Sequence, residues 1–253
     1  MSSRTWTTRA VASEARAARF ELWRAVEAQH LAATMVLVDT LDEQQTLERL
    51  LDEGKPPVPA EARGLHWLLF TPFRYPPPPG GSRFRGPNDI GVFYGADEIR
   101  TACAELGYWR WRHLRESPAL DAMPLRPQTV FRTAVAAAAV DLRQPPFAAA
   151  RAQWTDPDDY GACQALARTA RDAAVGAIRY ESVRDPQRGG CAAVLAPRAF
   201  ARGSPLEQQT WMLSVARERV VWQRTGVARS HAFEFAAAGW TLPSSPAPRR
   251  RRP

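Results

Sequence analysis

The chain has 253 residues, of which 45% are hydrophobic and 24% are charged, and this composition is ordinary for a globular protein. The length suffices for one large domain or two small ones with a sizeable core. No apolar stretch approaches the ~20 residues of a membrane-spanning helix, and the N-terminus lacks the apolar segment of a secretory signal. We therefore expect a cytoplasmic protein that does not cross a membrane.

The positive charge is concentrated at the C-terminal end. The formal net charge is +8, and four of these charges come from the arginines of 249–252, in a tail that also contains several prolines. We expect this tail, 241–253, to be disordered. An Arg-rich tail can bind nucleic acid without sequence preference. The other arginines are spread along the chain, so we expect no nucleic-acid-binding surface outside the tail.

Cysteine and histidine spacing gives no sign of a metal site. Cys103, Cys163 and Cys191 lack Cys-x-x-Cys spacing, and the four histidines lack the spacing of metal ligands. We therefore expect reduced cysteines that serve as packing residues, and no bound metal.

The first 60 residues are predicted to form a helical extension, 1–60. Apolar residues recur near the 3.6-residue period over 9–36, which is typical of an amphipathic helix. A second helix should begin at the capping-box sequence Thr40-Leu-Asp-Glu43 and end near Gly54. We expect the extension to pack on the domain that follows it, with a dimer contact as the alternative.

A central strand is predicted next, over Gly64–Phe70, because this run is continuously apolar. Arg74 follows at the expected end of the strand, and we consider it a secondary candidate for a binding site. The four prolines of 76–79 can enter neither a helix nor an inner strand, so they should form a stiff extended loop.

The stretch 80–111 combines three kinds of chemistry on adjoining elements. A Gly-rich turn carries Arg83 and Arg85, a short apolar strand ends at Tyr94, and a helix capped near Asp97 carries Glu105. Arg83, Tyr94 and Glu105 follow one another at intervals of 11 residues, and they could converge on one pocket. Glu105 lies on the shoulder of the apolar helix face, where desolvation raises a carboxyl pKa unless a cation compensates.

The same residues also fit an ordinary structural role. Arg83 and Arg85 could be solvated turn residues, Tyr94 a core tyrosine, and Glu105 half of a surface ion pair. Perturbed ionisable groups mark functional sites only statistically, so spacing alone leaves both interpretations open.

The remainder predicts a compact mixed sheet with helices, hence an α+β domain over 61–240. Ser182 follows one of its strands and lacks the His and the G-x-S-x-G context of a hydrolase nucleophile. The expected elements are strands at Thr129–Val135 and Val140–Leu142, a helix from Thr155 or Asp156 to about Ala174, a hairpin of Ala177–Tyr180 and Cys191–Leu195, a hairpin or bent strand over 208–224, and a short strand at His231–Phe235.

Four short motifs together resemble the RES domain family, which carries G-R-[WF], L-Y, A-x-x-E and a late Ser after a strand. The matching segments are Ser82-Arg83-Phe84, Val92-Phe93-Tyr94, Ala102-Cys103-Ala104-Glu105, and Ser182. The chain has Ser82 where the family usually has Gly, Phe84 where it usually has Trp, and an Arg-to-Tyr spacing that is one residue longer. Arg85 is therefore a second candidate for the arginine of the first motif. The resemblance spans roughly 64–224.

The resemblance implies an ADP-ribosyltransferase-like fold and action on NAD. By this resemblance, Glu105 would orient the ribose or stabilise its developing positive charge, and Arg83 would grip phosphate. Tyr94 would stack on or bond the nicotinamide end, and Ser182 would fix a hydroxyl or amide of the substrate. The chain lacks a G-x-G-x-x-G sequence after a strand, so NAD would be a substrate and not a reusable cofactor.

These expectations favour an NAD-cleaving enzyme, either a glycohydrolase or a phosphorylase. By the resemblance it would be the toxin of a bacterial toxin–antitoxin pair, with a helix-turn-helix (Xre-type) antitoxin as partner; it could also form a homo-oligomer. The alternatives are a protein ADP-ribosyltransferase and a non-catalytic interaction protein whose basic tail binds nucleic acid.

Overall fold

A computed structural model describes residues 6–28, 38–226 and 231–240 of the chain. The predicted disordered tail, 241–253, and the part of the predicted first helix beyond residue 28 lie outside these residues. Among the described residues, no helix is both long and apolar enough to cross a membrane.

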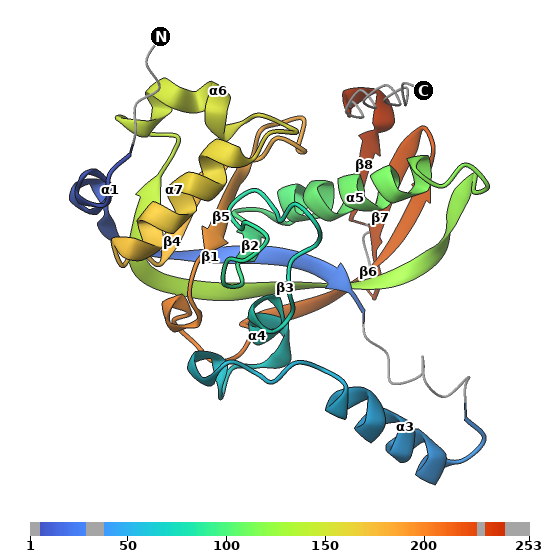
Figure 1. Ribbon diagram of the computed structural model, residues 1–253. Helices are drawn as coiled ribbons and strands as arrows, with labels where there is room; N and C mark the ends of the chain where they lie inside the picture. Colours follow the sequence, from blue (N-terminus) through green and yellow to red (C-terminus); the bar gives the residue numbers. More distant parts are fainter. Residues whose placement is uncertain (1–5, 29–37, 227–230, 241–253) are drawn as a thin grey trace, which may run out of the picture.

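One mixed sheet organises the molecule (Figure 1). The strands run in the order β1-β2-β5-β4-β3-β6-β7-β8; β3 and β4 are parallel, and the other pairs are antiparallel. This arrangement, with helices on the sheet, confirms the predicted mixed α+β class. The strands are β1 (Arg16–Glu27), β2 (Phe93–Ala96), β3 (Ala122–Asp141), β4 (Ala177–Glu181), β5 (Gly190–Val194), β6 (Glu207–Ala216), β7 (Arg219–Arg224) and β8 (Ala232–Ala236).

The strand pairings close on themselves around one half of the sheet. β1 pairs with β3 from Arg16↔Ala139 to Glu27↔Gln128, and it also meets β2 at Trp23↔Ala96. The five strands β1, β2, β5, β4 and β3 therefore form a closed circuit, and β6, β7 and β8 extend from the first half of β3. Because β1 and β2 share a single paired position, the two strands diverge beside it.

Helices cover the sheet on both faces (Figure 1). Helix α5 lies over β6–β8, helices α1, α6 and α7 gather at the other end, and α4 lies on the opposite face from α5. The helices are α1 (Thr8–Glu14), α3 (Leu41–Glu53), α4 (Trp67–Arg74), α5 (Ile99–Arg115), α6 (Arg151–Trp154) and α7 (Gly161–Asp172), with short 3-10 turns at Ala60–Ala62, Phe147–Ala150, Pro197–Ala199 and Ala237–Gly239.

Three buried clusters form the core, one under each group of helices. The cluster under α7 includes Leu166 and Ile178, and the cluster beneath α5 includes Trp211 and Trp222. The third lies between α4 and the sheet, where Phe93 contacts neighbouring aromatic rings edge-on. Burial of such aromatic side chains supplies much of the free energy that stabilises a fold.

The predicted helix over 9–36 is wrong for most of its described length. The chain is helical only over Thr8–Glu14 and then forms β1, which is paired with β3 along its full length of 12 residues. The recurring alanines fit a helix period, but strand formation depends on partners elsewhere in the chain. Backbone pairing with β3 therefore overrides the local helix propensity. Part of the predicted extension 1–60 thus belongs to the sheet, and the proposed domain boundaries stay predictions.

The predicted central strand at Gly64–Phe70 is also wrong, because the chain forms helix α4 there. His66 is the N-cap residue, and its Nδ1 accepts a hydrogen bond from the backbone N–H of Leu68. A short, continuously apolar run fits a buried strand and a buried helix equally well, and periodicity cannot separate the two.

Other elements differ in their limits. The strand predicted to end at Tyr94 continues to Ala96 as β2, which begins at Phe93. The residue before α5 is Glu98, whereas Asp97 forms ion pairs with Arg143 and Arg179. The two strands predicted in 129–142 are a single strand, β3, that runs through the alanines between them, and the helix predicted from residue 155 begins at residue 161 as α7.

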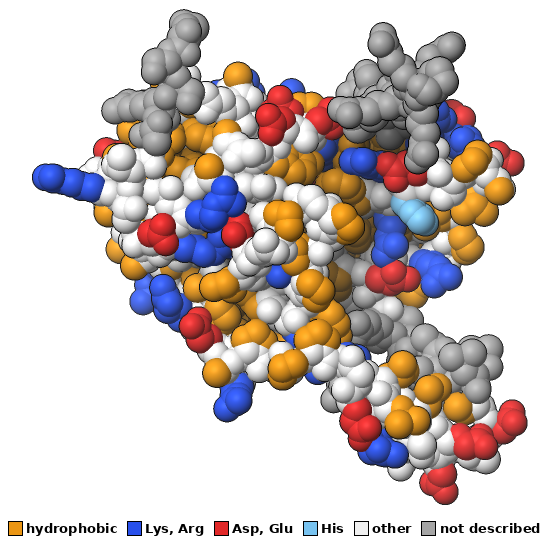
Figure 2. Space-filling model, viewed as in Figure 1, with side chains coloured by type: hydrophobic (Ala, Val, Ile, Leu, Met, Phe, Trp, Pro, Cys, Tyr) orange, Lys and Arg blue, Asp and Glu red, His pale blue; other side chains and the backbone are white. Residues whose placement is uncertain are grey.

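Local signals located several elements correctly. In the capping box before α3, the N–H of Glu43 donates to Thr40 Oγ1 at 3.2 Å and the N–H of Thr40 donates to a Glu43 carboxylate oxygen at 3.1 Å. The predicted hairpin around Ser182 is β4–β5, and the 208–224 region is the hairpin β6–β7. Helix α3 stands away from the sheet (Figure 1), and Figure 2 shows hydrophobic side chains on its surface. Leu41 and Leu50 of this helix are exposed.

Candidate functional site

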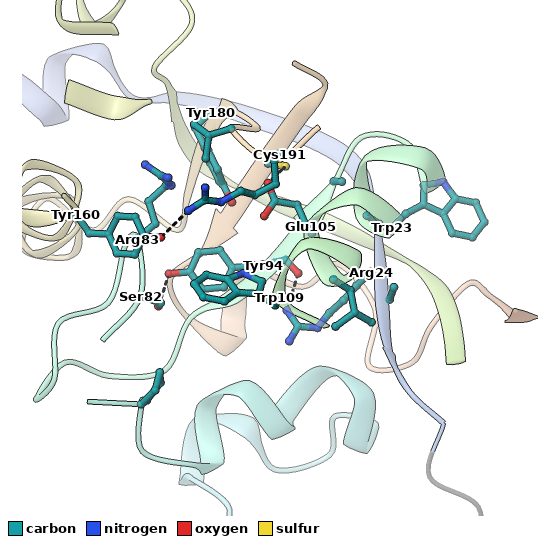
Figure 3. A pocket seen from close by; sticks show the side chains of 18 of the residues that line it. Trp23, Arg24, Ser82, Arg83, Tyr94, Glu105, Trp109, Tyr160, Tyr180 and Cys191 are labelled. Atoms are coloured by element: carbon teal, nitrogen blue, oxygen red, sulfur yellow. Dashed lines mark hydrogen bonds between the residues drawn. The ribbon is translucent and has the colours of Figure 1, made fainter. Parts of the chain in front are cut away.

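A pocket of about 380 Å³ opens where β1 and β2 diverge. Its walls come from β1, β2, α5, the turn around residue 82, Tyr160, and the segment that follows β4 (Figure 3). Arg83, Tyr94 and Glu105, which the sequence motifs single out, all line this pocket. The fold thus brings together the three residues that the sequence spaces at equal intervals.

Arg83 is buried in the pocket wall with 8% of its surface exposed. Its turn is closed by a backbone bridge between Ser82 and Arg85. The Arg83 guanidinium donates to the carbonyl of Trp154 at 2.9 Å and lies 4.7 Å from the centre of the Tyr160 ring. Burial lowers the pKa of Arg83, but nearby thiol, phenol and carboxyl groups more than offset this, so the pKa is raised and the side chain stays charged.

The hydroxyl of Tyr94 is already engaged by the protein. It lies 2.7 Å from the Ser82 hydroxyl and accepts a hydrogen bond from the N–H of Phe84 at 2.9 Å. Burial raises the pKa of Tyr94 to about 12, so the phenol stays protonated at physiological pH. The hydroxyl therefore holds the turn that carries Arg83, and the ring of Tyr94 is the part that faces the pocket.

Glu105 and Ser182 contact each other directly. The Ser182 hydroxyl donates to Glu105 Oε1 at 2.5 Å. Burial raises the pKa of Glu105, partly offset by this hydrogen bond and by the charges of Arg83 and Arg184. Ser182 is fully buried and does not line the pocket, so its contact is with the carboxylate.

Asp185 anchors the loop that carries Ser182. Its carboxylate accepts a hydrogen bond from Thr101 Oγ1 at 2.8 Å and forms an ion pair with Arg100, and both partners belong to the first turn of α5. A Cβ at Gly189 would approach Thr101 Oγ1 to 2.1 Å, which only glycine avoids. The loop is thereby fixed against the helix that presents Glu105.

Two of the predicted binding residues lie outside the pocket lining. Arg74 donates to the carbonyl of Pro56, and its guanidinium lies 5.9 Å from the ring of Tyr75. Arg85 donates to the carbonyls of Tyr75 and Asp89, at 2.9 and 3.2 Å. Of the two arginines that the motif spacing leaves open, Arg83 is therefore the one that faces the pocket.

The structure adds Arg184 and Tyr160 to the pocket wall. Arg184 is 5% exposed, donates to the Tyr160 hydroxyl at 3.2 Å, and lies over the ring of Tyr108, 3.9 Å from its centre. In the sequence, the signal for Arg184 as a site residue is its position two residues after Ser182.

Arg24 is a further cation in the lining, and it comes from β1. Its Nη1 donates to the carbonyl of Tyr94 at 2.6 Å, and its guanidinium lies 4.8 Å from the centre of the Phe93 ring. Burial lowers the pKa of Arg24 to about 10, so it remains charged at neutral pH. The sequence does not mark this residue as part of the site, because 9–36 is predicted as a helix outside the domain.

The charges of the pocket lining are unbalanced. Arg24, Arg83 and Arg184 face one carboxylate, that of Glu105, and within the described part of the chain none of the three arginines forms an ion pair with a carboxylate. Buried charges without partners are costly, so this wall favours an anionic ligand. No group of three or more potential metal-ligating side chains is found among the residues that the structure describes.

Cys191 also lines the pocket, with its Sγ 4.0 Å from Glu105 Oε1. Burial raises the pKa of this thiol well above its usual value. A thiol that stays protonated is a poor nucleophile, so Cys191 contributes shape and not reactivity.

Comparison with known proteins identifies the family. The family model described as "RES domain" matches residues 58–216, more than half of the chain, and the protein therefore belongs to the RES domain family. The match begins after β1, so Arg24 lies outside it. None of the curated proteins matches the chain.

A solved structure with a related shape is that of the M. tuberculosis MbcT–MbcA toxin–antitoxin complex. It shares 13% sequence identity, with 91% of this chain and 92% of that chain covered, at a TM-score of 0.45.

Proposed function

We propose that this RES domain protein binds NAD in the pocket and cleaves the bond between ribose and nicotinamide. The observation that carries the proposal is the placement of Glu105, whose carboxylate accepts a hydrogen bond from Ser182, in a pocket lined by arginines. Among the described residues, none of these arginines forms an ion pair with a carboxylate. A ligand with phosphate groups and a ribose that becomes positive during reaction fits this distribution of charge.

The chemistry needs a carboxylate beside the sugar. When the C1′–N bond of NAD breaks, its electron pair leaves with nicotinamide, which departs neutral, and positive charge develops on the ribose. Glu105 in its ionised form would stabilise that charge. The raised pKa of Glu105 follows chiefly from burial, and the low-dielectric surroundings that cause it also strengthen the attraction between carboxylate and cation.

The other motif residues would bind and position. Arg83 would hold a phosphate, because its guanidinium is buried and keeps donors free for an anion. Tyr94 would offer its ring to the nicotinamide end while its hydroxyl keeps the arginine turn in place. Ser182 would act through Glu105 by fixing the carboxylate.

The group that accepts the ADP-ribosyl part of NAD distinguishes three possible activities. Water would make the protein a glycohydrolase, inorganic phosphate a phosphorylase, and a protein side chain an ADP-ribosyltransferase. We favour the first two. The resemblance to toxins paired with helix-turn-helix antitoxins supports a toxin role, and the antitoxin partner and a homo-oligomer stay predictions.

The test incubates the purified full chain with NAD, in buffer with and without phosphate, and measures the released nicotinamide by chromatography. Wild type should consume NAD, and Glu105→Gln should be slower by on the order of 100-fold or more. Glu116→Gln, an exposed residue just after the same helix, is the matched control and should behave as wild type. If wild type leaves NAD intact even with phosphate and cell extract added, the proposal fails.

A further inference from the structure

Tyr160 contacts two guanidinium groups, one on its ring and one on its hydroxyl. The Arg83 guanidinium lies 4.7 Å from the ring centre, beside Tyr160 in Figure 3, and Arg184 Nη2 lies 3.2 Å from the hydroxyl oxygen. All three residues line the pocket. Two cations thus meet at one aromatic side chain in the same wall.

The segment before α7 holds both cations in place. The carbonyl of Trp154 accepts from Arg83 Nη1, and the carbonyl of Pro157 accepts from Arg184 Nη2. A guanidinium has five N–H donors in a rigid fork. Apart from a contact between Arg83 and the Cys163 thiol, the other donors of both forks have no hydrogen-bond partner among the described residues.

The charges of both arginines are buried in the pocket wall. Arg83 and Arg184 are 8% and 5% exposed, and in the described residues neither forms an ion pair with a carboxylate. Burying a charge without a partner destabilises a fold, and a bound anion would relieve this cost. The carboxylate in the pocket lining is that of Glu105, whose pKa both arginines lower and which the proposed reaction needs for the ribose.

We infer that Arg83, Tyr160 and Arg184 form a subsite for a diphosphate, with Arg184 as its second cation. A diphosphate carries adjacent negative groups, one for each guanidinium. A single phosphate would leave one guanidinium without its own anionic group, and a nucleoside would leave both without one. The subsite would therefore select a dinucleotide over its nucleoside part. The identification of that dinucleotide as NAD rests on the proposed function, whereas diphosphate binding does not.

The experiment measures binding by calorimetry to the full chain, with inorganic pyrophosphate, orthophosphate, ADP-ribose and nicotinamide riboside as probes. The variants are Arg184→Gln, which removes the charge, and Arg184→Lys, which keeps the charge and loses the fork. The matched control is Arg188→Gln, because Arg188 belongs to the same loop, is exposed, and contacts Glu181 outside the pocket. Circular dichroism and thermal melts check that each variant is folded.

Arg184→Gln should weaken pyrophosphate and ADP-ribose binding by about 10- to 100-fold, the loss expected for one charge-assisted contact. The affinity of Arg184→Lys for these two probes should lie between those of wild type and Arg184→Gln. Nicotinamide riboside should bind every variant within about twofold of wild type, and Arg188→Gln should match wild type with all probes. Tyr160→Phe keeps the ring and removes one of the two hydrogen-bond acceptors of Arg184. It should give a smaller loss of affinity that is also confined to the phosphate-containing probes.

Several results would overturn the inference. These are undiminished pyrophosphate binding by Arg184→Gln, an equal loss for nicotinamide riboside, or no pyrophosphate binding by wild type. Orthophosphate binding as tight as pyrophosphate binding, with the same loss in Arg184→Gln, would indicate a site for a free phosphate. If wild type binds pyrophosphate through Arg184 but does not cleave NAD, the subsite stands and the proposed reaction fails. If wild type cleaves NAD and Arg184→Gln cleaves it at the same rate at limiting NAD, the proposed reaction stands and the subsite fails.

Discussion

The hydroxyl of Ser182 donates a hydrogen bond of 2.5 Å to Glu105, which joins the loop after β4 to the middle of α5. The same oxygen accepts from the backbone N–H groups of Arg184 and Asp185, at 3.2 and 2.9 Å. A hydroxyl has one donor and two acceptor positions, so Ser182 uses all of them within the protein. Ser182 is therefore a positioning residue for Glu105, and this role has measurable consequences.

Ser182→Ala should move the pH dependence of NAD cleavage. The Ser182 hydroxyl lowers the pKa of Glu105 against the larger effect of burial, so its removal should raise that pKa further. If the ionised carboxylate is the active form, the acidic limb of the rate profile shifts to higher pH. The measurement is the rate of nicotinamide release between about pH 4 and 9. Ser214→Ala, at an exposed position on β6, is the control, and coincident acidic limbs in all three proteins would contradict the assignment.

Glu105→Gln should stabilise the protein at neutral pH while it slows cleavage. The folded-state pKa of Glu105 is raised, so the folded protein binds this proton more tightly than the unfolded chain, whose Glu pKa is about 4.3. The favourable contribution of the protonated group is complete below that value and is lost as pH rises through the folded pKa. Gln carries no charge to bury, so the difference from wild type should appear at high pH.

Thermal melts at about pH 4 and 7.5 test this stability difference. Glu105→Gln should melt above wild type at the higher pH and near it at the lower, with a shift of about 2–4 °C for each kcal/mol in a protein of this size. Glu116→Gln provides the comparison for loss of an exposed carboxylate. A melting temperature for Glu105→Gln below that of wild type at pH 7.5 would count against a destabilising carboxylate.

Tyr94→Phe should loosen the turn that carries Arg83. The substitution leaves the N–H of Phe84 without its acceptor and removes the contact with Ser82, which should cost about 1–3 kcal/mol of unfolding free energy. The KM for NAD should rise because the arginine is held less firmly. Between pH 7 and 10 the ratio of variant to wild-type rate should stay constant, since the Tyr94 pKa is about 12.

Denaturant unfolding and steady-state kinetics measure both effects of Tyr94→Phe. Tyr75→Phe alters a phenol at the protein surface and should leave unfolding and KM unchanged. A Tyr94→Phe protein that is as stable as wild type would show that the hydroxyl does not support the turn.

Asp185→Asn should separate the Ser182 loop from α5. Asp185 is 2% exposed, and its carboxylate binds both Arg100 and Thr101, so the loss of its charge should cost about 2–4 kcal/mol of unfolding free energy. Because the loop also fixes the Glu105 carboxylate, the kcat for nicotinamide release should fall and its acidic limb should shift as in Ser182→Ala. Asp121→Asn, at a fully exposed carboxylate that pairs with Arg217, is the control. A loss of stability with an unchanged pH profile would restrict Asp185 to a purely structural role.

Parts of the fold and site were predictable because they depend on neighbours in the chain. The capping box before α3 and the hairpins β4–β5 and β6–β7 follow from turn and cap residues within a few positions of each element. The motif residues Arg83, Tyr94 and Glu105 lie close together in the sequence, and short connections bring their elements side by side. Residue types and local spacing were sufficient for these parts.

Tertiary pairing decided the rest. The segment Arg16–Glu27 is a strand because β3 supplies its partner more than a hundred residues later, and local propensity contains no trace of that partner. This pairing placed Arg24 at the pocket, just as the β4–β5 hairpin and α7 brought Arg184 and Tyr160 to Arg83. Ser182 likewise faces Glu105 because the loop packs on α5. The sequence by itself determined which chemical groups are present and the local turns that carry them. Only the tertiary structure decided which of these groups meet, because side-chain contacts between distant segments depend on how the whole sheet closes.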